Sequence, residues 1–515
     1  MPKKYVIGVD LGTTTIKAVF LDTQSNRIVS TQTEEIFPVA TQNADHMEYD
    51  PKDWMEYTKR ILARGFEEGI EPHDVAGICF GGWTVMAFLV KKDGSPVTNA
   101  VHYNDMRHLE LLHEADKLYG KIAVERNGNY IGMYSASVKQ YWWKVKHPGV
   151  FRAADYVATE VSYMNYMLSG QWAWNRVEAG FYSQYNAYTR QWDDEIIDAM
   201  GFDRSMFPRL VDAWEVVGEV TEDGAAWSGL APGTLVFGGV DDASPVALAT
   251  GAFKKGQGFV SAGSAANIVA NTGGPVSHPT AITYPHCIPG LTMTITVMSA
   301  TGLSYKWMRN AFGQLEGQMA LLTGADAYDY LNEQAKNAKP GANGVVFLPY
   351  LDGDYTPNND PNARGVFVGM GTDTTKGDML RASLEGVAFS MLDNMMLIRE
   401  MGGDIDKIVL TGGIARSPLW LQIIADITNC PVSLPEETEG APFGSAIVAA
   451  VGAGLYQDFE QAVERTVRVE QDAFVPDQKN NALYGELYEV YKSLYPNLKQ
   501  AFASIADIKE KYNQE

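Results

Sequence analysis

Residues 5–21 read YVIGVDLGTTTIKAVFL, and this stretch decides the fold. Tyr5–Val9 is a short, apolar and β-branched run of the kind that forms a buried strand. Asp10–Thr15 follows as a turn, since glycine accepts the backbone conformations that tight turns need. A second apolar run, Ile16–Leu21, predicts the returning strand. The chain therefore opens as a strand, a turn and a strand.

The same order of segments returns at residues 258–270. An apolar run over 258–261 leads into the small residues of 262–265, and another apolar run follows over 267–270. Between and after the two hairpins, short apolar runs alternate with stretches of helical periodicity, which favours mostly parallel sheets covered by helices. The sequence therefore predicts two α/β domains built on one plan.

Several further segments have clear local signals. We expect helices over 54–66, 154–168 and 378–400, and an amphipathic closing helix on the stretch with Leu483, Leu487, Val490 and Leu494. A short strand is expected over 407–411, and Ser417-Pro418 is typical of a helix start. Residues 340–365 are dense in Gly, Pro, Asn and Asp, which predicts a long ordered loop.

Composition excludes several classes of protein. The length of 515 residues indicates at least two domains, and a net charge of −22 argues against nucleic-acid or membrane-surface binding. Three scattered cysteines argue against a disulfide framework or a zinc site. No apolar run reaches the roughly 18 residues of a transmembrane helix, and early charges leave no signal peptide. We expect a soluble, cytoplasmic protein.

The first turn carries groups suited to phosphate. Around Gly12, backbone N–H groups and threonine hydroxyls can cradle phosphate oxygens, while the carboxylate of Asp10 faces the magnesium that accompanies them. The alternative is a plain hairpin whose threonines reflect strand propensity.

Two later turns are also candidates. The pair Gly412-Gly413 lies between a strand and a helix start and lets another molecule approach the backbone, although such a pair is often only a turn. Asp241 and Asp242 follow a strand and a glycine turn at another helix start. One carboxylate there can accept a proton from a hydroxyl while the other caps the helix, and we expect the two acids to divide these roles.

Taken in order, these turns resemble those of the FGGY carbohydrate kinases. Phe347-Leu348-Pro349-Tyr350-Leu351, Thr356-Pro357 and Asp360–Gly365 are similar to the xylulokinase-like branch. The run Gly365-x-Phe367-x-Gly369-Met370, followed by Asp378-Met379-x-x-Ala382-Ser383-Leu384-Glu385, fits the C-terminal signature of the family. The resemblance extends from about residue 5 to about residue 470.

The resemblance implies an α/β, actin-like ATPase fold with two ribonuclease-H-like domains and a cleft where MgATP and a sugar meet. It implies an N-terminal domain over 1–250 with the sugar site, the first phosphate loop and the catalytic aspartate. A C-terminal domain over 251–475 would carry the second phosphate loop and the adenosine pocket, and 476–515 would form a helical tail.

The resemblance also implies roles for individual residues. These are Asp10 at the metal; Gly12, Thr13, Thr14 and Lys17 in the first phosphate loop; Gly263 and Ser264 in the second; Gly412, Gly413 and Ala415 at the adenosine; and Asp242 as the catalytic base. Asp241 stands where relatives usually have a small residue or histidine, so it is the poorer candidate for the base.

The sugar pocket departs from the xylulokinase-like pattern. Trp83, Thr84, Asn104 and Asp105 are the expected substrate-binding residues together with Asp242, and Arg107 would brace them. Thr84 and Val85 replace a Met-His pair that lines the sugar pocket in relatives. Losing a polar partner favours a different acceptor, because unpaired buried polar groups are costly.

The function implied is ATP-dependent phosphorylation of a linear ketose or polyol, and D-xylulose is the first candidate for the acceptor. Ribulose, erythritol and an autoinducer-type polyhydroxy ketone stay as alternatives, the last because 284–309 resembles the autoinducer kinases. A chaperone-type ATPase and a non-catalytic nucleotide- or sugar-binding protein are alternatives from other classes. Retention of both Asp10 and Asp242 argues against the non-catalytic alternative, and a homodimer is compatible with the resemblance.

Overall fold

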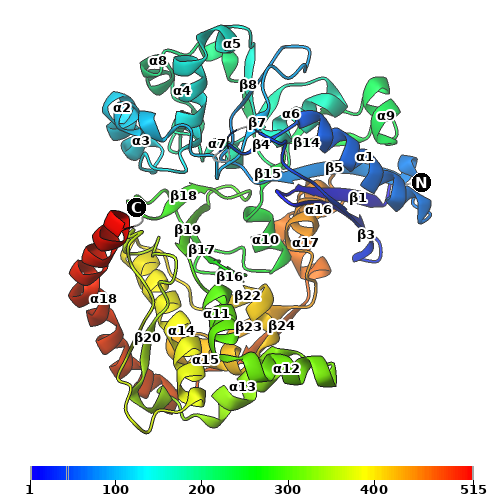
Figure 1. The fold of residues 1–515 in the computed structure, drawn as a ribbon. Coiled ribbons are helices and arrows are strands. Elements are labelled where there is room, and N and C mark those ends of the chain that lie inside the picture. Colours follow the sequence, from blue (N-terminus) through cyan, green and yellow to red (C-terminus); the bar gives the residue numbers. More distant parts are fainter. Residues whose placement is uncertain (1–2, 42, 44–45, 513–515) are drawn as a thin grey trace. The chain divides into compact units, whose positions relative to one another are not determined.

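The computed structural model of the chain describes residues 3–41, 43 and 46–512. They form two compact units, each discontinuous in sequence (Figure 1). The first unit contains Met1–Phe253, Gly273–Met293 and Glu437–Arg468, and the second contains Lys254–Thr272, Thr294–Glu436 and Val469–Glu515. This division differs from the predicted boundary at residue 250, because Gly273–Met293 and Glu437–Arg468 pack with the first unit.

A mixed sheet lies at the centre of the first unit, in the strand order β13–β14–β5–β1–β2–β3, with β15 also paired to β5. β1, β5, β14 and β15 are parallel, whereas β2, β3 and β13 run antiparallel to their neighbours. The bounds are β1 Tyr5–Leu11, β2 Thr15–Asp22, β3 Arg27–Glu35, β5 Val75–Gly82, β13 Val216–Glu219, β14 Leu235–Phe237 and β15 Val240–Asp241. The predicted opening hairpin is confirmed.

Helices cover both faces of this sheet, because successive side chains of a strand point to opposite faces. On the face of Gly8, α16 (Gly440–Gly452) approaches so closely that a Cβ at Gly8 would lie 2.0 Å from the carbonyl oxygen of Pro442. Phe20 is paired with Ile7 and so faces the other way, where its ring lies against Gly65 of α1 (Pro51–Glu67). The predicted helix over 54–66 is therefore confirmed, with Asp50 as its N-cap.

The first unit also carries smaller elements around the sheet. The helices are α2 Leu112–Ala115, α3 Lys121–Arg126, α4 Ala136–Lys146, α5 Pro148–Arg152, α6 Glu160–Ser169, α7 Arg176–Ala179, α8 Asp194–Ala199, α9 Glu222–Ser228, α10 Ser244–Ala249 and α17 Phe459–Thr466. The strands are β4 Glu48–Tyr49, β6 Phe88–Val90, β7 Ala100–Val101, β8 Tyr156–Ala158, β9 Ala173–Asn175, β10 Tyr185–Asn186, β11 Gln191–Trp192, β12 Arg209–Val211 and β18 Ile282–Pro285.

The second unit repeats the plan of the first. Its strands run in the order β19–β17–β16–β22–β23–β24, and β16, β22 and β23 are parallel. The strand bounds are β16 Gly258–Ala262, β17 Ala266–Thr272, β19 Thr292–Met298, β20 Val346–Leu348, β21 Val366–Val368, β22 Ile408–Thr411, β23 Val432–Pro435 and β24 Val469–Phe474. The helices are α11 Gly302–Phe312, α12 Gln314–Thr323, α13 Ala327–Asn337, α14 Lys376–Glu400, α15 Pro418–Thr428 and α18 Gln478–Tyr512. The second predicted hairpin and the helices after Thr375 and Ser417 are confirmed.

Two local predictions are wrong in part. The helix expected over 154–168 begins only at Glu160, because Tyr156–Ala158 pairs with β6 and Thr159 caps the helix in a capping box with Ser162. The loop expected over 340–365 contains β20, a buried strand that the apolar run Val346–Leu348 forms with β21.

The closing helix α18 is confirmed, and its predicted face is correct in part. Leu487 and Leu494 pack against the core of the second unit, whereas Leu483 and Val490 are 40% and 46% exposed and tyrosines fill the centre of the packed face. Their hydroxyls find acceptors there: Tyr484 donates to Glu385 (2.7 Å) and Tyr495 to Asp360 (2.9 Å). A buried tyrosine supplies apolar area and a polar handle, which a hydropathy pattern undervalues. Among the described residues, no helix is long and apolar enough to cross a membrane.

Candidate active site

Three parallel strands of the first unit end side by side, and the predicted residues follow those ends. Asp10 is level with Gly81 of β5, and Asp241 of β15 is level with Gly82. Because parallel strands deliver their carboxyl ends to one edge, the turn after β1, the segment after β5 and the acids of β15 gather there.

Asp10 lies opposite Lys17 in the β1–β2 hairpin. Burial raises the pKa of its carboxyl to about 7; the positive charge of Lys17 lowers that pKa and the negative charge of Glu439 raises it. The ammonium of Lys17 is 3.1 Å from the Glu439 carboxylate, and Oδ1 of Asp10 is buried with no hydrogen-bond partner in the part of the chain described.

The turn between β1 and β2 has a fixed backbone. A Cβ at Gly12 would lie 2.6 Å from the carbonyl oxygen of Thr15, so the close turn requires glycine. The carbonyl oxygens of Thr13 and Thr14 accept hydrogen bonds from the Tyr49 hydroxyl (2.6 Å) and the backbone N–H of Ile36 (2.9 Å). Thr14 itself is exposed.

Asp241 and Asp242 differ sharply in their surroundings. Asp241 is fully buried, and its carboxylate accepts hydrogen bonds from the backbone N–H groups of Ala243 (3.1 Å) and Ser244 (2.9 Å) and from the Ser244 hydroxyl. Asp242 is exposed and forms no ion pair within the described chain. Desolvation, and then the negative charges of Asp241 and Asp10, raise the pKa of Asp242 well above its ordinary value. Asp241 thus supports the start of α10, and Asp242 is left available.

The segment after β5 has a strained backbone. Thr84 and Val85 have φ of +49° and +51°, a conformation that costs a β-branched residue about 1–2 kcal/mol. Thr84 is only 2% exposed and Trp83 is also buried, whereas Val85 is partly exposed. Of these residues, Val85 is the best placed to meet a ligand.

The second predicted sugar segment is held by a buried ion-pair network. Asp105 is fully buried, and its carboxylate accepts hydrogen bonds from the Met47 backbone N–H (2.8 Å) and from the guanidinium of Arg107 (2.8 and 2.6 Å). Arg107 also pairs with Glu48 at 2.7 Å. These bonds favour a role for Asp105 in holding the segment, whereas the exposed Asn104 is free to face a ligand.

The predicted residues of the second unit gather in the same way. Ser261 and Thr411 are level on the parallel strands β16 and β22, so the turns at Gly263-Ser264 and Gly412–Ala415 follow adjacent strand ends. Gly412 has φ +93°, and a Cβ there would lie 2.3 Å from the carbonyl oxygen of Ala262. The carbonyl oxygen of Ser264 accepts the backbone N–H of Thr301 (2.8 Å), which fixes its turn against the start of α11. The structure thus brings the predicted residues together in two groups, one in each unit.

Sequence reasoning missed two buried acids of the first unit. Glu160 and Glu178 are both fully buried, and desolvation raises the pKa of Glu160 to about 8 and that of Glu178 well above its ordinary value. Asn175-x-x-Glu178 has the spacing of a capping box, and the Asn175 amide does donate to Glu178 (2.6 Å). That spacing is the signal that could have found Glu178, whereas Glu160 was hidden inside the helix predicted over 154–168.

A divalent cation with its own waters fits Asp10. Magnesium is commonly bound through one or two carboxylates plus water and phosphate, and the buried, unpartnered Oδ1 of Asp10 supplies such an oxygen. The described residues contain no group of three or more His, Cys, Asp or Glu side chains that could hold a metal alone.

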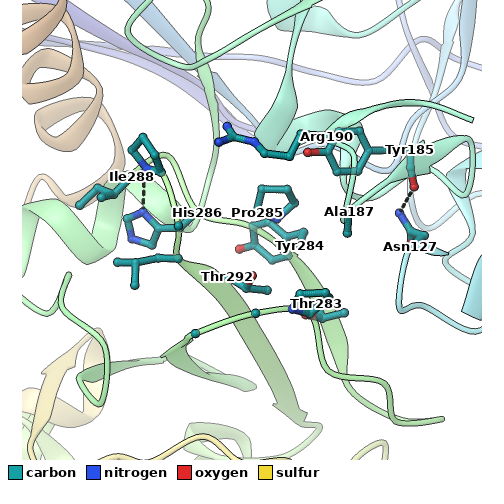
Figure 2. Close-up of a pocket in the computed structure, with 16 residues that line it drawn as sticks. Asn127, Tyr185, Ala187, Arg190, Thr283, Tyr284, Pro285, His286, Ile288 and Thr292 are labelled. Atoms are coloured by element: carbon teal, nitrogen blue, oxygen red, sulfur yellow. Dashed lines mark hydrogen bonds between the residues drawn. The ribbon is translucent and has the colours of Figure 1, made fainter. Parts of the chain in front are cut away.

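A separate cavity of about 160 Å³ lies elsewhere in the first unit, and none of the predicted residues lines it (Figure 2). Its wall includes Tyr284 and His286, whose Nδ1 accepts the backbone N–H of Ile288 (2.8 Å). Burial lowers the pKa of His286 to about 3, so this ring is neutral. The lining is mixed, with polar residues such as Asn127 and Thr283 beside apolar ones such as Pro285 and Ile288.

Comparison with known proteins defines the class. The model of the FGGY family of carbohydrate kinases matches twice: its N-terminal domain over residues 5–249 and its C-terminal domain over 260–453. The chain belongs to this family, has the actin-like ATPase fold and is an ATP-dependent carbohydrate kinase.

Individual relatives are similar over nearly their whole length. A xylulose kinase of Staphylococcus epidermidis is 29% identical, with 99% of this chain and 100% of the relative covered. An autoinducer-2 kinase of Escherichia coli is 26% identical, with 96% and 94% covered. The crystal structure of xylulose kinase from Rhodospirillum rubrum superposes with a TM-score of 0.88 at 26% identity, with 97% and 100% covered.

Proposed function

We propose that the phosphoryl acceptor is a hydroxyl of a linear ketose or polyol, and that D-xylulose is the first candidate substrate. The contrast between Asp241 and Asp242 carries the proposal. The carboxylate of Asp241 is hydrogen-bonded to the backbone at the start of α10, whereas Asp242 is exposed and feels the charge of Asp10. The similarity to xylulose kinases supports D-xylulose. The autoinducer-2 kinase, at 26% identity, keeps a polyhydroxy ketone as the second candidate, and ribulose and erythritol follow.

In this proposal Asp242 orients the acceptor hydroxyl and takes its proton late in the transfer. A sugar hydroxyl is a very weak acid, so a raised pKa makes Asp242 a better matched base than an ordinary aspartate. The phosphoryl transition state is loose, so most of the catalysis comes from positioning and charge stabilisation.

The remaining predicted residues serve ATP. Gly12, Thr13, Thr14 and Lys17 in the first unit, and Gly263 and Ser264 in the second, offer N–H groups, hydroxyls and a cation to phosphates, while Gly412, Gly413 and Ala415 offer an open backbone to the adenosine. Magnesium, held near Asp10, would neutralise charge on the phosphoryl oxygens. The location in the cytoplasm and a homodimer stay predictions.

We propose that the sugar pocket is formed by two kinds of residue, those that contact the sugar and those that hold the pocket wall in place; the predicted members are Trp83, Thr84, Asn104 and Asp105. The exposed Asn104 and the partly exposed Val85 would meet the sugar. Trp83, Thr84 and Asp105 are buried and would hold the wall behind them. An apolar Val85 predicts weaker discrimination for D-xylulose than a histidine would give.

A coupled ADP-release assay tests the proposal. The protein is offered MgATP with D-xylulose, D-ribulose, L-ribulose, erythritol or an autoinducer-type polyhydroxy ketone, and Asp242→Asn serves as the inactive control. D-xylulose should give the highest kcat/KM, with at least one other linear acceptor within about tenfold. Turnover confined to a cyclic sugar or an acid would refute the proposed class of acceptor.

A further inference from the structure

We propose that Glu160 is a positioning residue that holds the strained turn Trp83–Met86, and through it the wall of the acceptor pocket. This inference rests on the proposed function for its link to the sugar, but the contact itself does not. Glu160 is the first residue of α6, directly after the N-cap Thr159, and it points back at the segment after β5.

The contact is specific. The backbone N–H of Thr84 donates to Oε1 of Glu160 at 3.2 Å. Gly82 makes room for the carboxylate, since a Cβ there would lie only 2.3 Å from the same oxygen. Glu160 packs against Gly82 and accepts the backbone N–H of Thr84. These two contacts fix the point at which β5 ends and the turn begins.

The turn needs such a fixture. Two consecutive β-branched residues, Thr84 and Val85, have positive φ, and an isolated segment would leave that conformation. The far end of the turn is fixed as well, because the buried hydroxyl of Tyr182 donates to the carbonyl oxygen of Met86 at 2.9 Å. Two buried side chains from outside the turn therefore bracket the strained pair.

Glu160 acts here as a neutral hydrogen-bond acceptor rather than as a charge. It is fully buried and forms no ion pair among the described residues, and its Oε2 has no partner. The negative charge of Glu160 would raise the pKa of the fully buried Glu178, which carries an unpartnered Oε1 as well. Desolvation and the nearby acids favour the protonated form, as the raised pKa of Glu160 indicates.

The reach of the Glu160 side chain therefore matters, and its charge does not. Glu160→Gln keeps the length and an acceptor oxygen, whereas Glu160→Asp keeps the carboxyl group but is one methylene too short. We expect Glu160→Gln to keep the KM for the acceptor within about threefold of the parent. Glu160→Asp should raise that KM at least tenfold and leave the KM for ATP within about twofold.

A second measurement does not depend on catalysis. Amide hydrogen exchange of a peptide covering residues 82–87 should be at least tenfold faster in Glu160→Asp and in Tyr182→Phe, and unchanged in Glu160→Gln. If no acceptor is phosphorylated by the parent protein, the proposed function fails while the exchange experiment still tests the contact.

Three results would overturn the inference. One is a loss of acceptor affinity in Glu160→Gln as large as in Glu160→Asp, which would show that the length and an acceptor oxygen are not sufficient. Another is an acceptor KM unchanged in a folded Glu160→Asp protein. The third is exchange in 82–87 that responds to neither Glu160→Asp nor Tyr182→Phe. Where Glu160→Asp does not fold, loss of acceptor affinity in Glu160→Gln is enough to refute the proposal.

Discussion

Replacing each member of the Asp241–Asp242 pair by asparagine should separate stability from activity. Asparagine has nearly the shape of aspartate, so the comparison isolates the carboxylate. In Asp241→Asn one oxygen can still accept the N–H of Ser244, but the new amide group faces the N–H of Ala243, and one buried donor loses its partner. Such a loss costs about 1–3 kcal/mol, so Tm should fall by several degrees.

Asp242→Asn should behave in the opposite way. The side chain has no ion pair among the described residues, and its raised pKa means that the ionised form is disfavoured in the folded protein, so removing the charge should leave Tm unchanged or raise it. Removing a general base typically costs about 10²–10⁴-fold in turnover. Thermal unfolding and ADP release measured on both variants check this. An active Asp242→Asn beside a folded but inactive Asp241→Asn would show that the base is assigned to the wrong residue.

Three further predictions concern the same unit. Asp10→Asn should raise the magnesium concentration needed for half-maximal rate, since an amide holds a hydrated cation less well, and an unchanged requirement would leave Asp10 a turn former. Val85→His should raise kcat/KM for D-xylulose relative to erythritol by about threefold to tenfold, the value of one hydrogen bond, and a histidine that only lowers both rates would contradict this account of the wall. Glu160 has an unfolded pKa near 4.5 and a folded pKa of about 8, so its stabilising contribution is complete below pH 4.5 and is lost as pH rises to about 8. Tm should fall over that range in the parent and fall less in Glu160→Gln, and parallel curves would show that Glu160 does not titrate there.

Much of the fold was predictable because its decisive signals are local. The hairpin around Gly12, the second hairpin at 258–272 and the capped helix α15 each depend on a few neighbouring residues, and all appear in the structure. The closing helix shows the limit: its period was correct, but only Leu487 and Leu494 of the predicted face pack against the core, and tyrosines form most of the buried face. Tyr484 and Tyr495 are buried because acids on other elements accept their hydroxyls, and those acids lie far away in sequence.

In the candidate site, too, features that depend on neighbouring residues were predictable, and features that depend on distant residues were not. A local argument about the start of a helix predicted that Asp241 and Asp242 have different roles, but the choice of Asp242 as the base came from the resemblance to the family. The bracket around Trp83–Met86 could not be predicted, because Glu160 and Tyr182 reach the turn from elements far along the chain. Positive φ at Thr84 and Val85 is also invisible in sequence, since β-branched residues ordinarily indicate extended backbone.

The acids of the first unit make sense as two sets with different tasks. Asp10 and Asp242 reach the strand ends, where a cation and a sugar hydroxyl would use their ionised forms, and the negative charge of Asp10 raises the pKa of Asp242. Glu160 and Glu178 lie deeper, and burial favours their protonated forms. If the deep pair were ionised too, its charges would raise the pKa of Asp242 still further and leave less of the base in its working form. Keeping Glu160 neutral lets it hold the turn by hydrogen bonding without adding its negative charge to those that already raise the pKa of Asp242.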